Sequence, residues 1–256
     1  MNIITKIIEQ NMKKFLLILI MFAVTSLLAN AQNSRFSLSA GLLTMKILGD
    51  NPNSAPIIQR DPTKINIIGG GFSQTNSGFS VKLNYDLDEI GLYTIPIGIE
   101  YIHLNTRERI PIAKNVTALL SNDAYLPAAV IGFNYKFYKF KFTNVRAYVG
   151  LELKETFLQV GKFYREYRYD KPIDSSDVIN RDTKSAVSRF GSNLKLGFVG
   201  QIAGNIYINS FISFGILNIA PTDNNRGELL TTGIITEDKE TLTATMNFGL
   251  LLEYRF

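Results

Sequence analysis

The sequence predicts an all-β fold, an eight-stranded antiparallel up-and-down transmembrane β-barrel. Eight segments alternate apolar residues with small or polar ones, at the period of two that a β-strand requires. The connections between these segments alternate between short and long, which is typical of a barrel with all its long connections at one end. The composition agrees, because 46% hydrophobic residues, 11% aromatic residues and only 19% charged residues are unlike a disordered chain.

The N-terminus is predicted to be a signal peptide over residues 1–31, followed by the barrel over residues 32–256. Lys13 and Lys14 precede an apolar run at residues 15–24, and Ala29-Asn30-Ala31 has the small-residue pattern of a cleavage site. We therefore expect cleavage after Ala31 and export from the cytoplasm, with Met12 as a more natural start than Met1. The alternative is an uncleaved N-terminal anchor.

The eight predicted strands are clearest in the final segment. Every second position from Leu242 to Phe256 is apolar, and the positions between are mostly small or polar, with Leu251 as the exception. The predicted strands lie at residues 36–42, 79–86, 93–101, 125–137, 145–154, 193–201, 206–216 and 242–256. The predicted short connections lie at residues 86–92, 138–144 and 201–205, and the predicted long ones at residues 49–78, 106–124, 161–189 and 218–240.

The apolar face is expected to point toward lipid and the polar face into the lumen. Seven of the eight strands carry a glycine on the polar face, and a narrow barrel has room inside for few large side chains. The same face carries charges of both signs, which could pair in a water-poor lumen. These predicted lumen charges are Lys82, Glu100, Lys136, Glu152, Lys154, Lys195, Glu253 and Arg255. The alternative is a soluble periplasmic, lipocalin-like carrier with its faces reversed.

The last strand, Leu250-Leu251-Leu252-Glu253-Tyr254-Arg255-Phe256, resembles the C-terminal signal of Gram-negative outer-membrane proteins. The resemblance implies that the barrel-assembly machinery reads Tyr254 and Phe256. Residues 32–256 are similar to the small outer-membrane barrels described as porin-like or PorT-like. This implies a location in the outer membrane, with lipid and lipopolysaccharide as neighbours, and a role in the cell envelope.

The composition excludes several kinds of chemistry. Without cysteine there is no disulfide, thiolate nucleophile, zinc-thiolate site or iron-sulfur cluster, and a single histidine rules out a His-pair metal site. We expect no cofactor and no metal. The net charge of +5 includes Lys6, Lys13, Lys14 and Glu9 of the predicted signal peptide. The smaller surplus of the remaining chain does not indicate nucleic acid as a partner.

A pore and an enzyme are both disfavoured. Eight strands leave an interior that side chains fill, whereas open channels need about 16 strands. Barrels that modify lipids use a histidine with a nearby serine or carboxylate, and the deacylase pattern places the serine two residues after the histidine. Here His103 is followed by Leu104 and Asn105, so the nucleophile is missing. A lipid-modifying enzyme remains the alternative function.

The remaining hypothesis is surface binding through the long connections. Residues 161–170 combine cations with tyrosines, which could pair with lipopolysaccharide phosphates and stack on sugars or on an envelope protein partner. The candidate binding residues are Lys162, Tyr164, Arg165, Tyr167 and Arg168. We therefore expect a structural or surface-binding envelope protein, with an accessory role in a secretion system as a further expectation.

Overall fold

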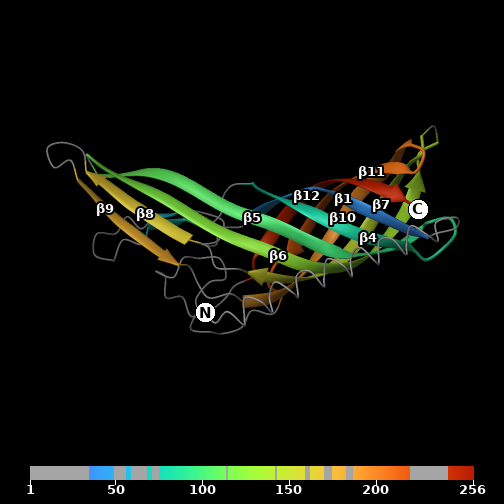
Figure 1. Cartoon of the computed structure of the whole chain (residues 1–256), viewed down its shortest axis with the longest axis horizontal. Helices are drawn as coiled ribbons and strands as arrows, with labels where there is room; N and C mark the ends of the chain where they lie inside the picture. Colours follow the sequence, from blue (N-terminus) through green and yellow to red (C-terminus); the bar gives the residue numbers. More distant parts are fainter. Residues whose placement is uncertain are drawn as a thin grey trace, which may run out of the picture.

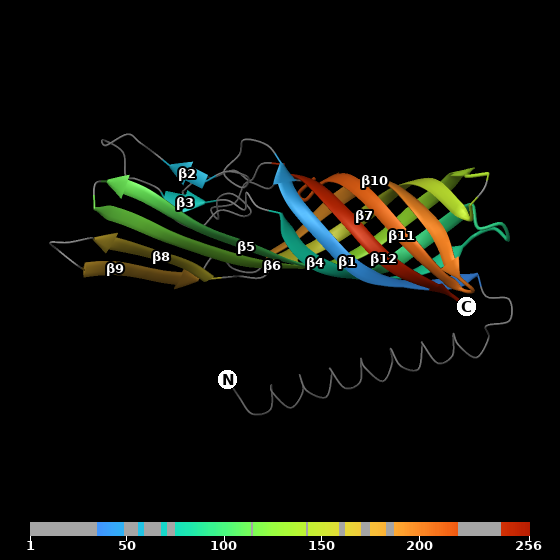
Figure 2. The ribbon, with the colours of Figure 1, turned by 90° about the horizontal axis from the view of Figure 1, so that it is seen from above.

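Eight strands close into an antiparallel barrel. The computed structural model describes residues 35–48, 56–58, 68–70, 75–113, 115–141, 143–158, 162–169, 175–182, 187–219 and 242–256. The barrel strands are β1 (Phe36–Leu48), β4 (Asn76–Asp86), β5 (Tyr93–Ala113), β6 (Val116–Lys139), β7 (Val145–Leu158), β10 (Val187–Ala203), β11 (Ile206–Ile216) and β12 (Ala244–Arg255). They pair in the order β5-β4-β1-β12-β11-β10-β7-β6, and the β5–β6 pairing closes the ring (Figures 1 and 2). The predicted fold class is confirmed.

The short connections and the described chain ends lie at the same end of the barrel, which we call the turn end. The backbone N–H of Asp86, at the end of β4, donates a hydrogen bond to the carbonyl of Arg35 at 2.8 Å. The N–H of Arg255, at the end of β12, donates to the carbonyl of Asn205 in the β10–β11 turn at 3.0 Å. All three predicted short connections are therefore present, between β4 and β5, between β6 and β7, and between β10 and β11.

Asp88 shapes the β4–β5 turn. Its carboxylate accepts hydrogen bonds from the backbone N–H groups of Tyr93 at 2.8 Å and Leu92 at 3.0 Å. The hydrogen bond from Tyr93 holds the pKa of this carboxyl below its ordinary value. Gly91 completes the turn with a φ of 66°, a left-handed conformation that glycine adopts without a steric penalty.

Burial separates the two faces of the barrel strands as the alternation predicts. Apolar side chains point outward and remain exposed, among them Leu42, Ile97, Ile131, Leu151, Leu194, Phe214 and Leu252. Polar and charged side chains are buried inside, among them Ser39, Lys82, Glu100, Asn134, Glu152, Lys195 and Thr245. A soluble barrel has the opposite distribution, so the lipocalin-like alternative is wrong. The apolar outer face makes this a transmembrane barrel.

Aromatic rings gather on the outer face at two levels. The level toward the long connections contains Phe79, Tyr101, His103 and Tyr125, and the level toward the turn end contains Tyr85, Tyr93 and Tyr135. Tyr125 and Tyr135 are ten residues apart on β6. In a strand tilted as in most barrels this spacing corresponds to about 25 Å along the barrel axis. That distance matches the apolar band of outer-membrane barrels, which aromatic girdles flank.

The lumen glycines lie opposite the large lumen side chains. In one row around the wall, Tyr148 is in register with Gly197, Gly197 with Phe211, and Phe211 with Gly249. The charged lumen residues follow the same rule, with the pairs Lys82 and Gly98, Glu152 and Gly132, Lys195 and Gly150, and Lys154 and Gly191. A Cβ at Gly132 would lie 2.7 Å from Cγ of Glu152. The glycines therefore provide the space in which the large groups pack.

Two predicted long loops consist largely of strands, and this is a correction. β5 and β6 continue well beyond the barrel, with Asn115 at φ 69° in the turn between them, so most of residues 106–124 are strand. Within residues 161–189, β8 (Lys162–Tyr169) pairs with the outer half of β6, and β9 (Ser175–Asp182) pairs with β8. We call this four-stranded sheet, in the order β5-β6-β8-β9, the extension sheet (Figure 2).

The period-two alternation is interrupted in the extension sheet. Arg107, Glu108 and Arg109 follow one another in β5, so the apolar and polar positions do not alternate there. Two shorter strands, β2 (Pro56–Ile58) and β3 (Ile68–Gly70), pair with each other in the first long connection. The described part of the chain contains no helix long and apolar enough to span a membrane. The predicted signal peptide and Met12 lie outside the described residues.

Candidate functional site

Five of the predicted lumen charges form one chain of ion pairs. Nζ of Lys82 lies 2.9 Å from Oε1 of Glu100 and 2.6 Å from Oε1 of Glu152. Glu100 also pairs with Lys154 at 2.6 Å, and Glu152 with Lys195 at 2.8 Å. We call Lys154, Glu100, Lys82, Glu152 and Lys195, in this order, the lumen chain. All five side chains are at most 6% exposed, so each charge depends on its partners rather than on water.

The lumen chain crosses the interior of the barrel. Lys82 is on β4 and Glu152 is on β7, and β5 and β6 stand between these two strands in the wall. Their 2.6 Å ion pair therefore runs across the lumen rather than along the sheet. The ring of Phe211 lies beside two lysines of the lumen chain. Nζ of Lys195 is 3.9 Å and Nζ of Lys82 is 5.7 Å from the ring centroid. Cation–π contacts at these distances add stabilisation.

The lumen is also filled by Tyr148. Its side chain is 2% exposed, and its hydroxyl donates a hydrogen bond to Oδ1 of Asn209 at 2.8 Å. Tyr148, Phe211 and the lumen chain are all buried inside the barrel. These buried side chains fill the described part of the lumen, as expected for an eight-stranded barrel.

The other three predicted lumen charges lie toward the turn end and do not join the lumen chain. Lys136 pairs with Asp86 at 3.4 Å. Arg255 donates from Nε to Oε1 of Glu253 at 2.9 Å. The predicted alternation already places Asp86 on the inward face of its strand, but Asp86 is not among the predicted lumen charges.

The surface-binding candidates lie on β8 in the extension sheet. Glu166, a residue that the sequence analysis passed over, accepts hydrogen bonds from Tyr164 Oη at 3.0 Å and from Arg168 Nε at 2.7 Å. The bond from Arg168 lowers the pKa of Glu166, and the bond to Glu166 raises the pKa of Tyr164. Residues two apart share a face of a strand, so Tyr164, Glu166 and Arg168 lie on one face of β8. Tyr167 lies on the other face. The side chains of Lys162 and Arg165 are outside the described part of the structure.

The single histidine lies on the outer face of β5, near the aromatic level at the extension end. Its Nε2 is 3.2 Å from Oδ1 of Asp123, and its ring stacks on Tyr125 with centroids 4.7 Å apart. Ser77 is opposite His103 in the β4–β5 register, yet among the described contacts no hydrogen bond joins the two side chains. A serine nucleophile needs a base within hydrogen-bond reach. His103 therefore has a carboxylate partner but no bonded nucleophile.

The two residues of the predicted assembly signal lie at the turn end. The rings of Tyr254 and Phe256 contact edge to face with centroids 5.4 Å apart, and Tyr254 points outward with 46% of its surface exposed. The N–H of Phe256 donates to the carbonyl of Phe36 at 3.2 Å, which joins the two ends of the described barrel. In the described ranges no three His, Asp or Glu side chains gather in a way that could hold a metal ion.

Several solved structures resemble this chain. Neisserial surface protein A aligns with a TM-score of 0.45 at 10% identity, over 87% of this chain and 98% of that one. Ail, the attachment invasion locus protein of Yersinia pestis, solved with the heparin analogue sucrose octasulfate, aligns with a TM-score of 0.38 at 11% identity, over 86% and 97%. The P. putida toluene transporter TodX aligns with a TM-score of 0.32 at 8% identity, over 86% and 90%. No family model and no curated protein sequence matches the chain. Similarities this low carry no inference about ligands.

Proposed function

We propose that this chain is a Gram-negative outer-membrane protein that holds the extension sheet at the cell surface, as a structural or surface-binding component of the envelope. The observation that carries the proposal is the continuity of β5 and β6 from the barrel wall into the extension sheet. The apolar outer face anchors the barrel in lipid, and the lumen chain closes it. The protein therefore works as an anchored platform rather than as a channel.

The surface that binds is the extension sheet, and its proposed partners are lipopolysaccharide and an envelope protein. Tyrosines and arginines supply stacking area and phosphate-pairing donors. Tyr164 and Arg168 are already arranged around Glu166, which fixes their positions before any partner arrives. An accessory role in a secretion system would use the same sheet. Assembly by the barrel-assembly machinery through Tyr254 and Phe256 belongs to the same proposal.

We expect no catalysis from this barrel. The feature closest to a catalytic group is the His103–Asp123 pair, which lacks a hydrogen-bonded nucleophile among the described residues. The test is the mass of lipid A from cells that express the wild-type chain or His103→Ala. We expect identical masses, and a modification that depends on His103 would establish the enzyme instead.

The location of the extension sheet is tested by labelling single cysteines, because the chain contains none. Val178 lies exposed on β9, and Asn205 lies exposed in the β10–β11 turn at the opposite end. A membrane-impermeant maleimide is expected to label Val178→Cys on intact cells, and Asn205→Cys only after the outer membrane is permeabilised. The reversed labelling pattern would place the extension sheet in the periplasm and overturn the surface role.

Binding to lipopolysaccharide is tested by removing the cations of β8. Replacing Lys162, Arg165 and Arg168 with serine is expected to weaken binding of the refolded protein to lipopolysaccharide micelles by at least about fivefold, because each exposed ion pair contributes a fraction of a kcal/mol. Lys141→Ser, at the turn end, is the matched control and should bind as the wild type does. Equal affinities for all three proteins would remove lipopolysaccharide from the proposal.

A further inference from the structure

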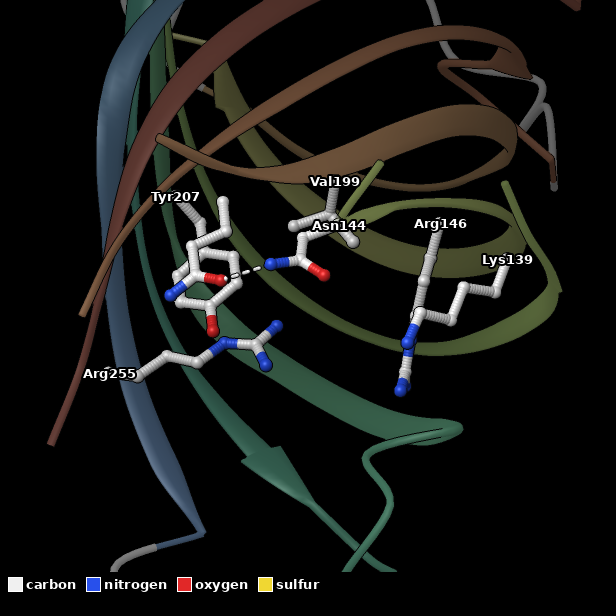
Figure 3. Close-up of a pocket in the computed structure, with 7 residues that line it drawn as sticks. Lys139, Asn144, Arg146, Val199, Tyr207 and Arg255 are labelled. Carbon is white, nitrogen blue, oxygen red and sulfur yellow. Dashed lines mark hydrogen bonds between the residues drawn. The ribbon is translucent and has the colours of Figure 1, made fainter. Parts of the chain in front are cut away.

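A polar cavity opens at the turn end of the barrel, away from the extension sheet. Its volume is about 130 Å³, and Lys139, Arg146 and Arg255 line it together with Tyr207 (Figure 3). The three cations come from the ends of β6, β7 and β12. In Figure 3, Arg255 lies on one side of the cavity and Lys139 and Arg146 lie on the other.

Two of these cations are direct cross-strand neighbours. Lys139 and Arg146 are in register in the β6–β7 pairing, and both contribute to the lining of the cavity. Like charges placed directly opposite each other on a sheet destabilise it. Among the described residues neither side chain has a carboxylate partner that would compensate this repulsion. The arrangement therefore costs free energy unless an anion lies between the two groups.

The two arginines of the cavity, Arg146 and Arg255, are held in position by the surrounding structure. Nη1 of Arg146 donates to the carbonyl of Ile90 in the β4–β5 turn at 2.6 Å, which fixes the guanidinium. The guanidinium of Arg255 stacks on Tyr207, 3.9 Å from the ring centroid, while its Nε donates to Glu253. The described residues that line the cavity include three cations and no carboxylate. Guanidinium groups that are fixed by stacking or by backbone contacts lose little entropy when they bind an oxyanion.

Two amides complete the polar wall. Nδ2 of Asn144 donates to Oε1 of Gln201 at 2.8 Å, so these side chains hold each other across the β6–β7 and β10–β11 turns. Nε2 of Gln201 also donates to the carbonyl of Gly204 at 2.6 Å. These hydrogen bonds preorganise this part of the cavity wall. A tetrahedral anion can accept bonds from several converging donors at once.

We propose that this cavity binds a phosphate group, held by Lys139, Arg146 and Arg255. The phosphate could be free phosphate or the phosphate of a lipid headgroup, and both share the chemistry that the three cations recognise. Phosphate neutralises the Lys139–Arg146 repulsion and accepts bidentate bonds from the guanidinium groups. The site is separate from the surface role of the extension sheet.

The test measures the unfolding midpoint of the refolded full chain in micelles of an uncharged detergent, with sodium phosphate or sodium chloride at equal ionic strength. Phosphate is expected to raise the midpoint of the wild type, because a ligand that binds only the folded state stabilises it. Arg146→Gln should weaken the apparent phosphate affinity about tenfold or more. Vesicles with and without a phosphatidylglycerol fraction provide the second arm. A rise with the lipid and none with inorganic phosphate would assign the headgroup.

Lys139→Gln gives a result that a merely structural lysine would not give. Removing this charge is expected to raise the midpoint in chloride, because the repulsion with Arg146 disappears, and to reduce the additional rise in phosphate. Lys141→Gln, two residues further along and exposed, should behave as the wild type in both salts. The change in gel mobility between boiled and unboiled samples verifies that each variant is folded. Identical midpoints in phosphate and chloride, together with no response to the anionic lipid, would overturn the proposal.

Discussion

Glu152→Gln is expected to lower the free energy of unfolding of the refolded barrel by about 3–5 kcal/mol, the cost of removing one partner from a buried ion pair. Glu152 is the acceptor for both Lys82 and Lys195, at 2.6 and 2.8 Å. Its loss leaves three ammonium groups of the lumen chain with one carboxylate, Glu100. The measurement is urea unfolding of the protein in lipid vesicles. The folded fraction at each urea concentration is determined from gel mobility without boiling.

The control for this prediction is an exposed ion pair. Glu89 lies 3.6 Å from Arg35 with 89% of its side chain exposed, so Glu89→Gln should change the free energy of unfolding by less than about 1 kcal/mol. The double variant Glu152→Gln with Lys195→Met removes one charge of each sign. It should be destabilised by less than the sum of the two single variants, because the two side chains contact each other. If Glu152→Gln lowers the free energy of unfolding no more than Glu89→Gln does, water solvates the lumen charges and the ion pairs do not carry the predicted stability.

Ile131→Arg is expected to cost about 2–4 kcal/mol, because it places a charge on the lipid-facing side near the middle of the membrane. Ile131 lies between the two aromatic levels of β6 and is 50% exposed. The matched control is Val178→Arg on β9, where the side chain is 49% exposed but lies in the extension sheet. That change should be nearly neutral, since water solvates the arginine.

The measurement is again the unfolding free energy in vesicles, with the two arginine variants compared directly. Equal effects at Ile131 and Val178 would contradict the assignment of the outer face to lipid. A larger loss at Val178 would mean that the extension sheet, rather than the barrel, meets the membrane.

The two faces of the barrel strands could be predicted from the sequence because each residue reports its own environment. The alternation of apolar and polar residues correctly predicts that Leu252 points outward and Glu253 inward, and it requires no knowledge of their neighbours. The partners inside the lumen could not be predicted in this way. The Lys82–Glu152 pair depends on how far the strands are staggered around the closed barrel, and no local pattern in the sequence contains that quantity.

The extension sheet escaped prediction for a different reason. Polar residues such as Arg107 and Glu108 occupy successive positions in β5, so the period of two that predicts the barrel strands is absent there. The Glu166–Arg168 pair could have been predicted from the sequence, because residues two apart share one face of a strand. The cavity with Lys139 and Arg146 required the β6–β7 register, which contains an irregularity between Lys136 and Tyr138.

The most direct test of the lipid-facing barrel uses the absence of tryptophan from the chain. Single tryptophans at Ile131, Tyr148 and Val178 report the outer face, the lumen and the extension sheet, and the refolded proteins are compared in vesicles with brominated acyl chains. We predict strong quenching for Ile131→Trp and little for Tyr148→Trp or Val178→Trp. Fluorescence of Ile131→Trp that is unchanged by the brominated lipid would contradict the account, because the apolar face would then not be in contact with the membrane.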